Sequence, residues 1–223
     1  MITFKEFRDG IQHGVYRIID PSVKLMIKIG VTPNMITTCG FIGNVVAAAM
    51  IVLSSLYVEQ DDYSVIGWAG FMILFSSIFD MIDGYLARTG NMCSTFGAFY
   101  DSVLDRFCEL FTLSGLAFYC MQFGYTWQTV VVFISLIASI MVSYVRARAE
   151  GLDIECKVGL MQRPERVVVT SLGLMFAGLL QGCVSFDPMW IVIVPQIIIA
   201  VLASYTVIVR ILHVKKQMKQ VNN

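Results

Sequence analysis

The sequence predicts an all-α integral membrane protein with six transmembrane helices, an N-terminal amphipathic juxtamembrane helix, and both termini in the cytoplasm. Of its 223 residues, 57% are hydrophobic and only 14% are charged, and the mean hydropathy is +0.73. Soluble domains carry about a quarter charged residues, so the composition alone indicates a membrane protein. The uneven placement of lysine and arginine along the chain then decides its orientation.

Residues 1–33 are predicted to form a cytoplasmic juxtamembrane segment. Apolar residues recur at helical spacing over residues 3–28, with charged residues between them, which is typical of an amphipathic helix on a membrane surface. Asp20 and Pro21 are expected to break this helix and begin a second short one, because aspartate caps helices and proline suits a first turn. A Thr-Pro-Asn sequence at 32–34 is expected to begin the first span in the same way.

Six apolar segments are each long enough to cross a bilayer, which takes about 20 residues. The three connections on one side contain no lysine or arginine. The basic residues lie on the other side or at the span ends that face it, so the positive-inside rule places both termini in the cytoplasm and the chain in the cytoplasmic (inner) membrane. A membrane domain is expected over residues 34–215, followed by a short cytoplasmic tail over 216–223. The expected spans are 36–58, 65–88, 96–121, 127–147, 167–183 and 189–213.

Four aspartates lie within the second and third expected spans. Asp80 and Asp83 are three residues apart and Asp101 and Asp105 are four apart, so each pair shares one helix face. The two helices are joined by a short turn near residue 92 and therefore run antiparallel. In that hairpin Asp80 matches Asp105 in depth and Asp83 matches Asp101. All four carboxylates are expected to converge into one cluster.

Such a cluster needs compensation, because carboxylates in a low dielectric repel one another and lose hydration. Protonation, basic partners or divalent cations would each supply it. Carboxylate oxygens suit magnesium, manganese or calcium, and four of them form a natural cradle for two metals that clamp a transferring phosphoryl group. The small residues Gly84, Ala87 and Gly97 permit either close helix packing or close approach of a ligand. Arg88 lies at the cytoplasmic end of the second expected span, at the entrance to the cluster, either to bind a phosphate or to anchor the membrane topology.

The residue types and spacings in this hairpin resemble the complete signature of the CDP-alcohol phosphotransferase family. The resemblance implies a membrane enzyme in which an alcohol displaces CMP from a CDP-linked donor and a phosphodiester forms. Its eight positions correspond to Asp80, Asp83, Gly84, Ala87, Arg88, Gly97, Asp101 and Asp105.

The resemblance also implies a role for each position. The carboxylates of Asp80, Asp83 and Asp101 would bind two magnesium ions, or manganese. Asp105 would contact metal as well and would act as the base that deprotonates the acceptor hydroxyl. The CDP moiety of the donor would contact Val31, Thr32, Pro33, Asn34, Asp83, Gly84, Ala87, Arg88, Ser94 and Gly97.

The loop after the fourth span, within SYVRARAEGLDIECKVGLMQRPERVVV at residues 143–169, resembles the subfamily that makes phosphatidylinositol phosphate from CDP-diacylglycerol and inositol 1-phosphate (the L-myo form). Glycerol 3-phosphate is the second candidate acceptor, ahead of free inositol or another alcohol. Topology also requires basic residues here, and five basic and four acidic residues leave a net charge of only +1. The candidates for binding the acceptor phosphate are Arg146, Arg148, Lys157, Arg163, Arg166 and Arg210.

The expected partners are these two substrates, the lipid bilayer and a second copy of the chain in a homodimer, with no nucleic acid. Two other classes of protein fit the sequence less well. A cation transporter would need polar residues that continue through the outer halves of the spans, and those halves are apolar. A membrane scaffold without enzymatic activity would leave the four aspartates unexplained.

Overall fold

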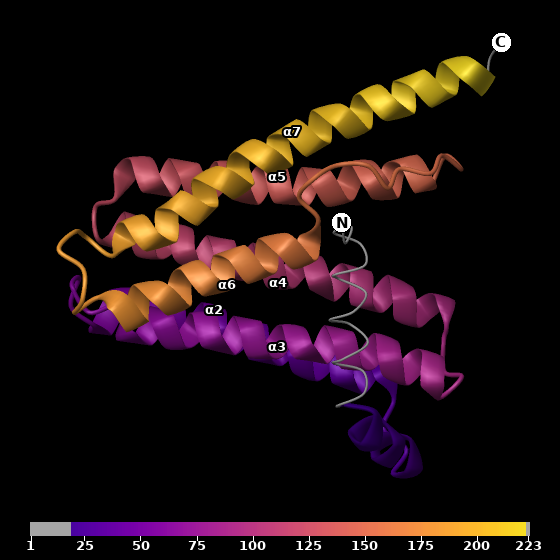
Figure 1. Ribbon diagram of the computed structural model, residues 1–223, viewed down its shortest axis with the longest axis horizontal. Helices are drawn as coiled ribbons and strands as arrows, with labels where there is room; N and C mark the ends of the chain where they lie inside the picture. The colour runs from indigo at the N-terminus through magenta and orange to yellow at the C-terminus, as the bar shows by residue number, and fades with distance from the viewer. Residues whose placement is uncertain (1–18, 222–223) are drawn as a thin grey trace, which may run out of the picture. The chain divides into compact units, whose positions relative to one another are not determined.

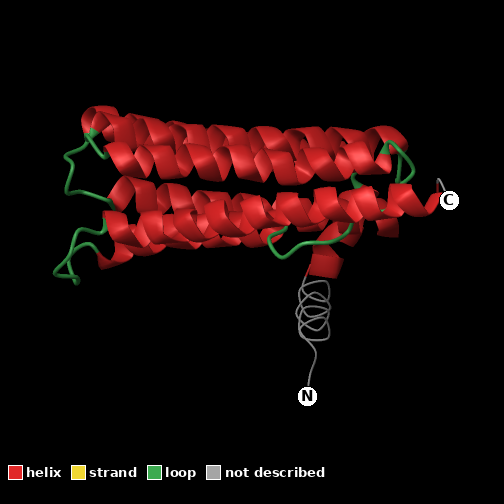
Figure 2. Cartoon of the chain, turned by 90° about the horizontal axis from the view of Figure 1, so that it is seen from above, coloured by secondary structure: helices red, strands yellow, loops and turns green. Residues whose placement is uncertain are grey.

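Helices joined by short loops form the described part of the chain, residues 19–221 of a computed structural model, and these residues contain no strand (Figures 1 and 2). A helical segment over residues 19–28 precedes the labelled helices. The bounds are α2 Pro33–Tyr57, α3 Ser64–Thr89, α4 Thr95–Gln122, α5 Thr126–Glu150, α6 Arg163–Leu180 and α7 Met189–Val221.

Four of the described helices, α2, α3, α5 and α7, are long and apolar enough to cross a membrane. This confirms a multi-pass, all-α membrane protein. All six predicted spans coincide with helices. Because α4 and α6 are not apolar enough to count as membrane-spanning helices by composition, the six-span arrangement stays a prediction. Both helices carry charged residues within their length, among them Glu109 on α4 and Arg166 on α6.

Most of the predicted N-terminal amphipathic helix lies outside the described residues. Residues 19–28 are helical, in agreement with the second short helix predicted to begin near Asp20 and Pro21, and the segment before the predicted break lies outside the described residues. The fixed φ of proline is compatible with a helix. The Asp20 carboxylate lies 2.6 Å from Lys24 Nζ and accepts a hydrogen bond of 2.9 Å from the Tyr85 hydroxyl of α3. Hydrogen bonds from Lys24 and then Tyr85 hold the pKa of Asp20 below its usual value.

The start of α2 is as predicted. Pro33 is the first helical residue, where its missing N–H costs nothing. The Thr32 carbonyl accepts the first two amide bonds of the helix, from Met35 at 3.1 Å and Ile36 at 3.4 Å. The local sequence therefore fixes where α2 begins, and with it the position of the residues on its first turns.

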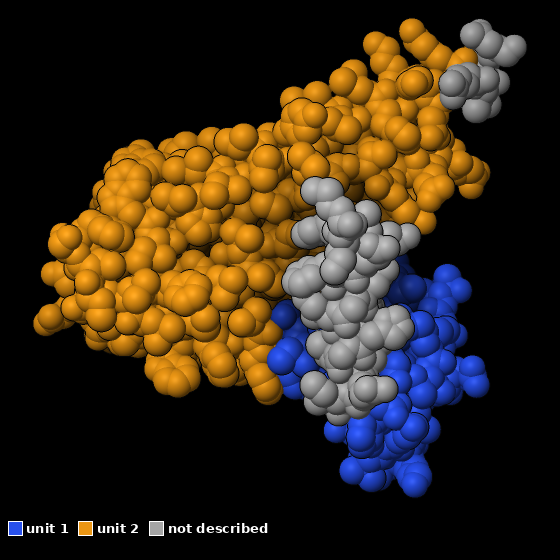
Figure 3. Space-filling model, viewed as in Figure 1, with its two compact units in different colours: residues 1–42, 76–105 blue, residues 43–75, 106–223 orange. Residues whose placement is uncertain are grey.

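The chain forms two compact units, distinguished by colour in Figure 3. Unit 1 comprises residues 1–42 and 76–105, and unit 2 comprises residues 43–75 and 106–223. Helices α2, α3 and α4 each contribute one end to unit 1. The core of unit 1 centres on Val23, Ile36 and Leu86, so the 19–28 helix packs on the first turns of α2 and the last turns of α3.

Close helix packing and buried polar bonds hold unit 2 together. On α3, a Cβ placed on Gly67 would lie 2.8 Å from the Gly178 Cα of α6, so the two helices touch backbone to backbone. Helices α5 and α7 run side by side (Figure 1), and Gln196 of α7 bridges them to α6. Its amide accepts from Ser135 at 2.9 Å and donates to Thr170 at 3.1 Å. Small residues and interhelical hydrogen bonds are the interactions available where lipid removes the hydrophobic driving force.

We predict that Gly67→Ala destabilises the fold, because the added methyl would overlap the Gly178 backbone, which cannot move aside as a flexible side chain can. Overpacking of this kind costs about 1–3 kcal/mol. Thermal unfolding of the full chain in detergent measures it. Gly182→Ala is the matched control, since a Cβ at that position meets nothing within 4 Å. Equal melting temperatures for the two variants would contradict the prediction.

Candidate functional site

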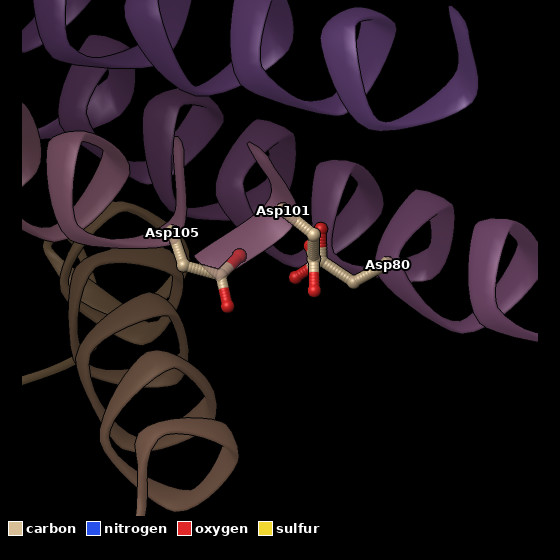
Figure 4. A group of neighbouring side chains, drawn as sticks. All are labelled: Asp80, Asp101 and Asp105. Atoms are coloured by element: carbon tan, nitrogen blue, oxygen red, sulfur yellow. The ribbon is translucent and has the colours of Figure 1, made fainter. Parts of the chain in front are cut away.

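Three aspartates of unit 1 form a cluster of carboxylates. Asp80 lies on α3, and Asp101 and Asp105 lie on α4. One oxygen from each carboxylate lies within 4.8 Å of the other two, and the side chains are directed toward a shared space (Figure 4). The three residues are partly buried. The antiparallel hairpin predicted from the spacing thus brings Asp80 and Asp105 together.

Asp83 lines the same cleft as Asp101 but has a separate hydrogen-bond partner. It is 6% exposed and does not belong to the group of three. Its Oδ2 instead accepts a hydrogen bond of 2.6 Å from the hydroxyl of Thr37 on α2. The prediction considered only the α3–α4 hairpin, and the partner that holds Asp83 comes from a third helix.

The cluster fits a divalent cation. Three partly buried carboxylates at this separation repel one another, and a cation bound between them removes that repulsion. Their oxygens are the hard ligands that magnesium, manganese and calcium prefer. The metal-binding role of Asp80, Asp83, Asp101 and Asp105 is supported by this chemistry and stays a prediction, as does the catalytic role of Asp105.

A cleft of about 220 Å³ opens in unit 1, and both Asp83 and Asp101 line it. Eight of the ten predicted donor contacts lie on its wall, namely Pro33, Asn34, Asp83, Gly84, Ala87, Arg88, Ser94 and Gly97.

Two predicted donor contacts lie off the wall. Val31 packs against the small core of unit 1, and Thr32 caps α2. Four other lining residues were not predicted from the sequence, namely Thr37, Met92, Cys93 and Ala98. For Thr37 a signal was present, because it follows Pro33 by one helical turn and so shares its face.

The glycines of the signature face the cleft. At Gly84, the nearest atoms to an added Cβ belong to the Arg88 guanidinium, from 3.4 Å. At Gly97, they are Ser94 Oγ at 2.9 Å and Asn34 Oδ1 at 3.2 Å. At neither glycine do the nearest atoms to an added Cβ belong to the backbone of a neighbouring helix. Of the two roles left open for them, close approach of a ligand is therefore favoured over helix packing.

The predicted acceptor residues belong to unit 2, where Arg166 is enclosed by a buried ion pair. Its side chain is 2% exposed, and Nε and Nη2 donate to the two carboxylate oxygens of Glu109 at 2.6 and 3.0 Å. Its Nη1 donates to the Met161 carbonyl at 3.0 Å. Glu109 was not among the predicted residues. Arg166 therefore holds α4, α6 and the preceding loop together, and its charge is balanced by contact.

Arg210 of α7 has a different environment. It is 3% exposed, and it donates to two neutral acceptors, the carbonyls of Val158 at 2.8 Å and Val142. Arg210 thus fastens the loop before α6 to α5 and α7, and its hydrogen-bond acceptors among the described residues are carbonyls.

The remaining acceptor candidates are more exposed. Arg146 pairs with Glu150 at 2.8 Å along α5, and Arg148 is exposed. Lys157 pairs with Glu155 at 2.9 Å, and this bond lowers the pKa of the Glu155 carboxyl. Arg163 is partly buried at the first position of α6.

A sequence model of the CDP-alcohol phosphatidyltransferase family matches residues 30–209. The chain belongs to this family. The match covers the carboxylate cluster, the cleft and every other predicted site residue except Arg210, which lies one residue beyond its end.

Two relatives and one solved structure illustrate the similarity. The chain is 31% identical to the phosphatidylinositol phosphate synthase of Cutibacterium acnes over 208 residues, which covers 91% of this chain and 95% of that protein. It is 32% identical to the archaetidylinositol phosphate synthase of Methanothermobacter thermautotrophicus over 205 residues, 92% of each chain. The crystal structure of Mycobacterium tuberculosis phosphatidylinositol phosphate synthase with bound CDP-diacylglycerol superimposes with a TM-score of 0.75 at 26% identity, over 89% of this chain and 94% of that one.

We predict that Glu109→Gln strongly destabilises the protein, because it leaves the buried Arg166 guanidinium without a counter-charge. Breaking one side of a buried pair costs about 3–5 kcal/mol. The matched control is Glu150→Gln, which breaks the exposed pair with Arg146 and is expected to cost about 0–1 kcal/mol. Thermal unfolding in detergent compares the two. A Glu109→Gln protein as stable as the control would show that the pair contributes no net stability.

Proposed function

We propose that the chain is a phosphatidylinositol phosphate synthase, which transfers the phosphatidyl group of CDP-diacylglycerol to inositol 1-phosphate and releases CMP. The observation that carries the proposal is the carboxylate cluster beside a cleft lined by eight of the predicted donor contacts, within a domain of the CDP-alcohol phosphatidyltransferase family. The acceptor is inferred from the relatives, whose names describe products with an inositol phosphate headgroup.

The lipid of the donor is supported separately. The bacterial name describes a phosphatidyl product and the archaeal name an archaetidyl product, so the relatives share the headgroup and differ in the lipid. We favour diacylglycerol because the solved structure at 26% identity holds CDP-diacylglycerol. The test below separates the two donors.

In the proposed reaction the acceptor hydroxyl attacks the phosphorus that bears the diacylglycerol. The new P–O bond forms as the bond to CMP breaks, and CMP leaves with the electron pair. Asp105 takes the hydroxyl proton, as a base positioned on α4 beside Asp101. Two magnesium ions, or manganese, held by Asp80, Asp83, Asp101 and Asp105 would neutralise the pyrophosphate and the departing phosphate.

The cleft residues bind and orient the donor in this proposal. Gly84 and Gly97 leave room for the nucleotide to approach the backbone of α3 and α4. The exposed guanidinium of Arg88, which lies over Gly84, is suited to a phosphate of the pyrophosphate group. Asn34 and Ser94 present side-chain polar atoms beside Gly97. Each of these contacts favours a negatively charged, hydrogen-bonding ligand in the cleft.

For the acceptor phosphate we favour Arg210, together with Arg163 and Arg146. Among the described residues, Arg210 donates hydrogen bonds to the neutral carbonyls of Val158 and Val142, which leaves its charge to attract an anion. Arg166 is balanced by Glu109, and we assign it a structural role. Lys157 and Arg148 are exposed, and a flexible exposed charge discriminates acceptors weakly.

The membrane arrangement is part of the proposal. We infer six spans, both termini in the cytoplasm, and an active site facing the cytoplasm of the inner membrane, from which CMP can leave in water. Helix α4, with 28 residues, is about 42 Å long and α6, with 18, is about 27 Å, so both can cross. The charges of Glu109 and Arg166 satisfy each other, which supports their burial inside a bundle. A membrane domain over residues 34–215 and a homodimer complete the proposal.

The decisive experiment measures CMP release by the full chain in detergent with magnesium. Four acceptors are compared, inositol 1-phosphate, glycerol 3-phosphate, free inositol and serine, with CDP-diacylglycerol and with CDP-archaeol. We expect inositol 1-phosphate with CDP-diacylglycerol to be preferred. Asp105→Asn is expected to reduce kcat by about 10²–10⁴-fold while the donor still binds, because it removes the base.

Each other outcome has a defined meaning. Preference for glycerol 3-phosphate would make the chain a phosphatidylglycerophosphate synthase, and preference for CDP-archaeol would change the lipid. Absence of CMP release with every acceptor would end the enzymatic proposal. Full turnover by Asp105→Asn would remove that residue from the role of base.

We further predict that Gly97→Ala raises KM for the CDP-linked donor by about tenfold, equivalent to about 1.4 kcal/mol, because the methyl would displace Ser94 and Asn34 at the cleft wall. The KM for the acceptor is expected to change little. Gly182→Ala, outside unit 1 and free of neighbours within 4 Å, is the control. An unchanged donor KM would show that the nucleotide does not approach this glycine.

A further inference from the structure

The hydroxyl of Thr37 is a side-chain hydrogen-bond donor to Asp83 from a neighbouring helix. Thr37 lies on the second turn of α2 and is 5% exposed, while Asp83 on α3 is 6% exposed. The Thr37 Oγ1 lies 2.6 Å from Asp83 Oδ2 and 3.1 Å from the Pro33 carbonyl. Both Thr37 and Asp83 line the cleft. Thr37 lies outside the aspartate signature and was not a predicted site residue.

The single hydroxyl proton has two possible acceptors, and the carboxylate is the stronger. A hydrogen bond to a charged oxygen is shorter and about twice as strong as one to a neutral oxygen. The two distances follow that order, 2.6 Å to the carboxylate and 3.1 Å to the carbonyl. The contact with Pro33 is the usual one between a helical threonine hydroxyl and the carbonyl four residues earlier. It can remain a close contact while the hydroxyl proton is donated to the carboxylate.

The consequence is a fixed orientation for Asp83. Its carboxylate, if unrestrained, rotates about χ2 with little preference. A buried, charge-assisted hydrogen bond to one oxygen removes that freedom and determines how the other oxygen is presented to the cleft. Groups that orient metal ligands in this way contribute about 10–100-fold to metal affinity or activity.

We infer that Thr37 is a positioning residue, which orients the Asp83 carboxylate for the divalent cation that serves the CDP-linked donor. The inference rests on the proposed function for the identity of that donor. It assigns the start of α2 a role beyond contact with the nucleotide, because the helix end that bears Pro33 and Asn34 also orients a metal ligand on α3.

The adjacent threonine provides a matched control. Thr38 lies on the same turn of α2, and its hydroxyl contacts the Tyr100 hydroxyl at 3.0 Å and the Asn34 carbonyl at 2.7 Å. Both partners are neutral. Replacing either threonine by valine removes one hydroxyl and keeps the shape of the side chain, so the two variants differ in whether a carboxylate loses its donor.

The test measures Mn²⁺ binding to the full chain in detergent, without substrates, from the electron paramagnetic resonance signal of free Mn²⁺. Thr37→Val is expected to weaken Mn²⁺ binding by about 10–100-fold, and Thr37→Ser to stay within about threefold of the wild-type protein. Thr38→Val is expected to bind as the wild-type protein does. In turnover assays Thr37→Val should raise the metal concentration needed for half-maximal CMP release.

A double-mutant cycle distinguishes positioning from a general effect on the fold. In the Asp83→Asn background, Thr37→Val is expected to add less than a threefold further loss of Mn²⁺ binding, because the carboxylate it orients is gone. Unchanged Mn²⁺ binding in Thr37→Val would overturn the inference. So would a double variant whose loss of Mn²⁺ binding equals the product of the losses in the two single variants. If Thr37→Val does not fold, Thr37→Cys, whose thiol is a weak donor, replaces it with the same direction of change expected.

Failure of the inference and failure of the proposed function are separable. If Thr37→Val weakens Mn²⁺ binding and no acceptor releases CMP, the positioning role stands and the reaction is wrong. If CMP is released from CDP-diacylglycerol and Thr37→Val binds Mn²⁺ normally, the reaction stands and the positioning role is wrong.

Discussion

The convergence of carboxylates at the ends of apolar helices is the constraint on which the rest of unit 1 depends. Asp80, Asp101 and Asp105 lie within 4.8 Å of one another, and their mutual repulsion opposes folding unless a cation or hydrogen-bond donors offset it. The cleft reaches this group at Asp101, and Thr37 supplies a hydrogen-bond donor to the fourth carboxylate, that of Asp83.

Much of this site could be predicted from sequence because its residues are close in the chain. Periodicity alone places Asp80 on one helix face and Asp101 and Asp105 on another, and the short turn between the helices makes them meet. Asp83 shows where that reasoning ends. Its partner Thr37 lies 46 residues earlier, and no spacing rule relates the face of α2 to the face of α3. Asp20 shows the same limit, since its carboxylate accepts a hydrogen bond from Tyr85, 65 residues away.

The charged residues of unit 2 show the same limit of prediction from sequence. From the sequence, Arg166 is one of five basic residues in a loop of nearly balanced charge. Glu109, 57 residues away on α4, neutralises it, and that pairing makes Arg166 a support for the fold. Arg210, which the sequence places near the end of the last span, has carbonyl partners instead. Which arginine keeps a usable charge is therefore decided by tertiary contacts, and counting residues in the loop could not reveal it.

The difference between residues close in the chain and residues joined by tertiary contacts explains why the sequence specifies the donor site better than the acceptor site. The residues proposed for the CDP moiety come from the start of α2 and one hairpin, so their spacing is itself a signature. The arginines proposed for the acceptor come from α5, α6 and α7, so a shared pocket for them depends on tertiary contacts of the folded unit. Under the proposed function, these charges recognise an inositol phosphate, whereas the lipid tails contact mainly apolar helix surface. Relatives that share a headgroup and differ in lipid are what this division predicts.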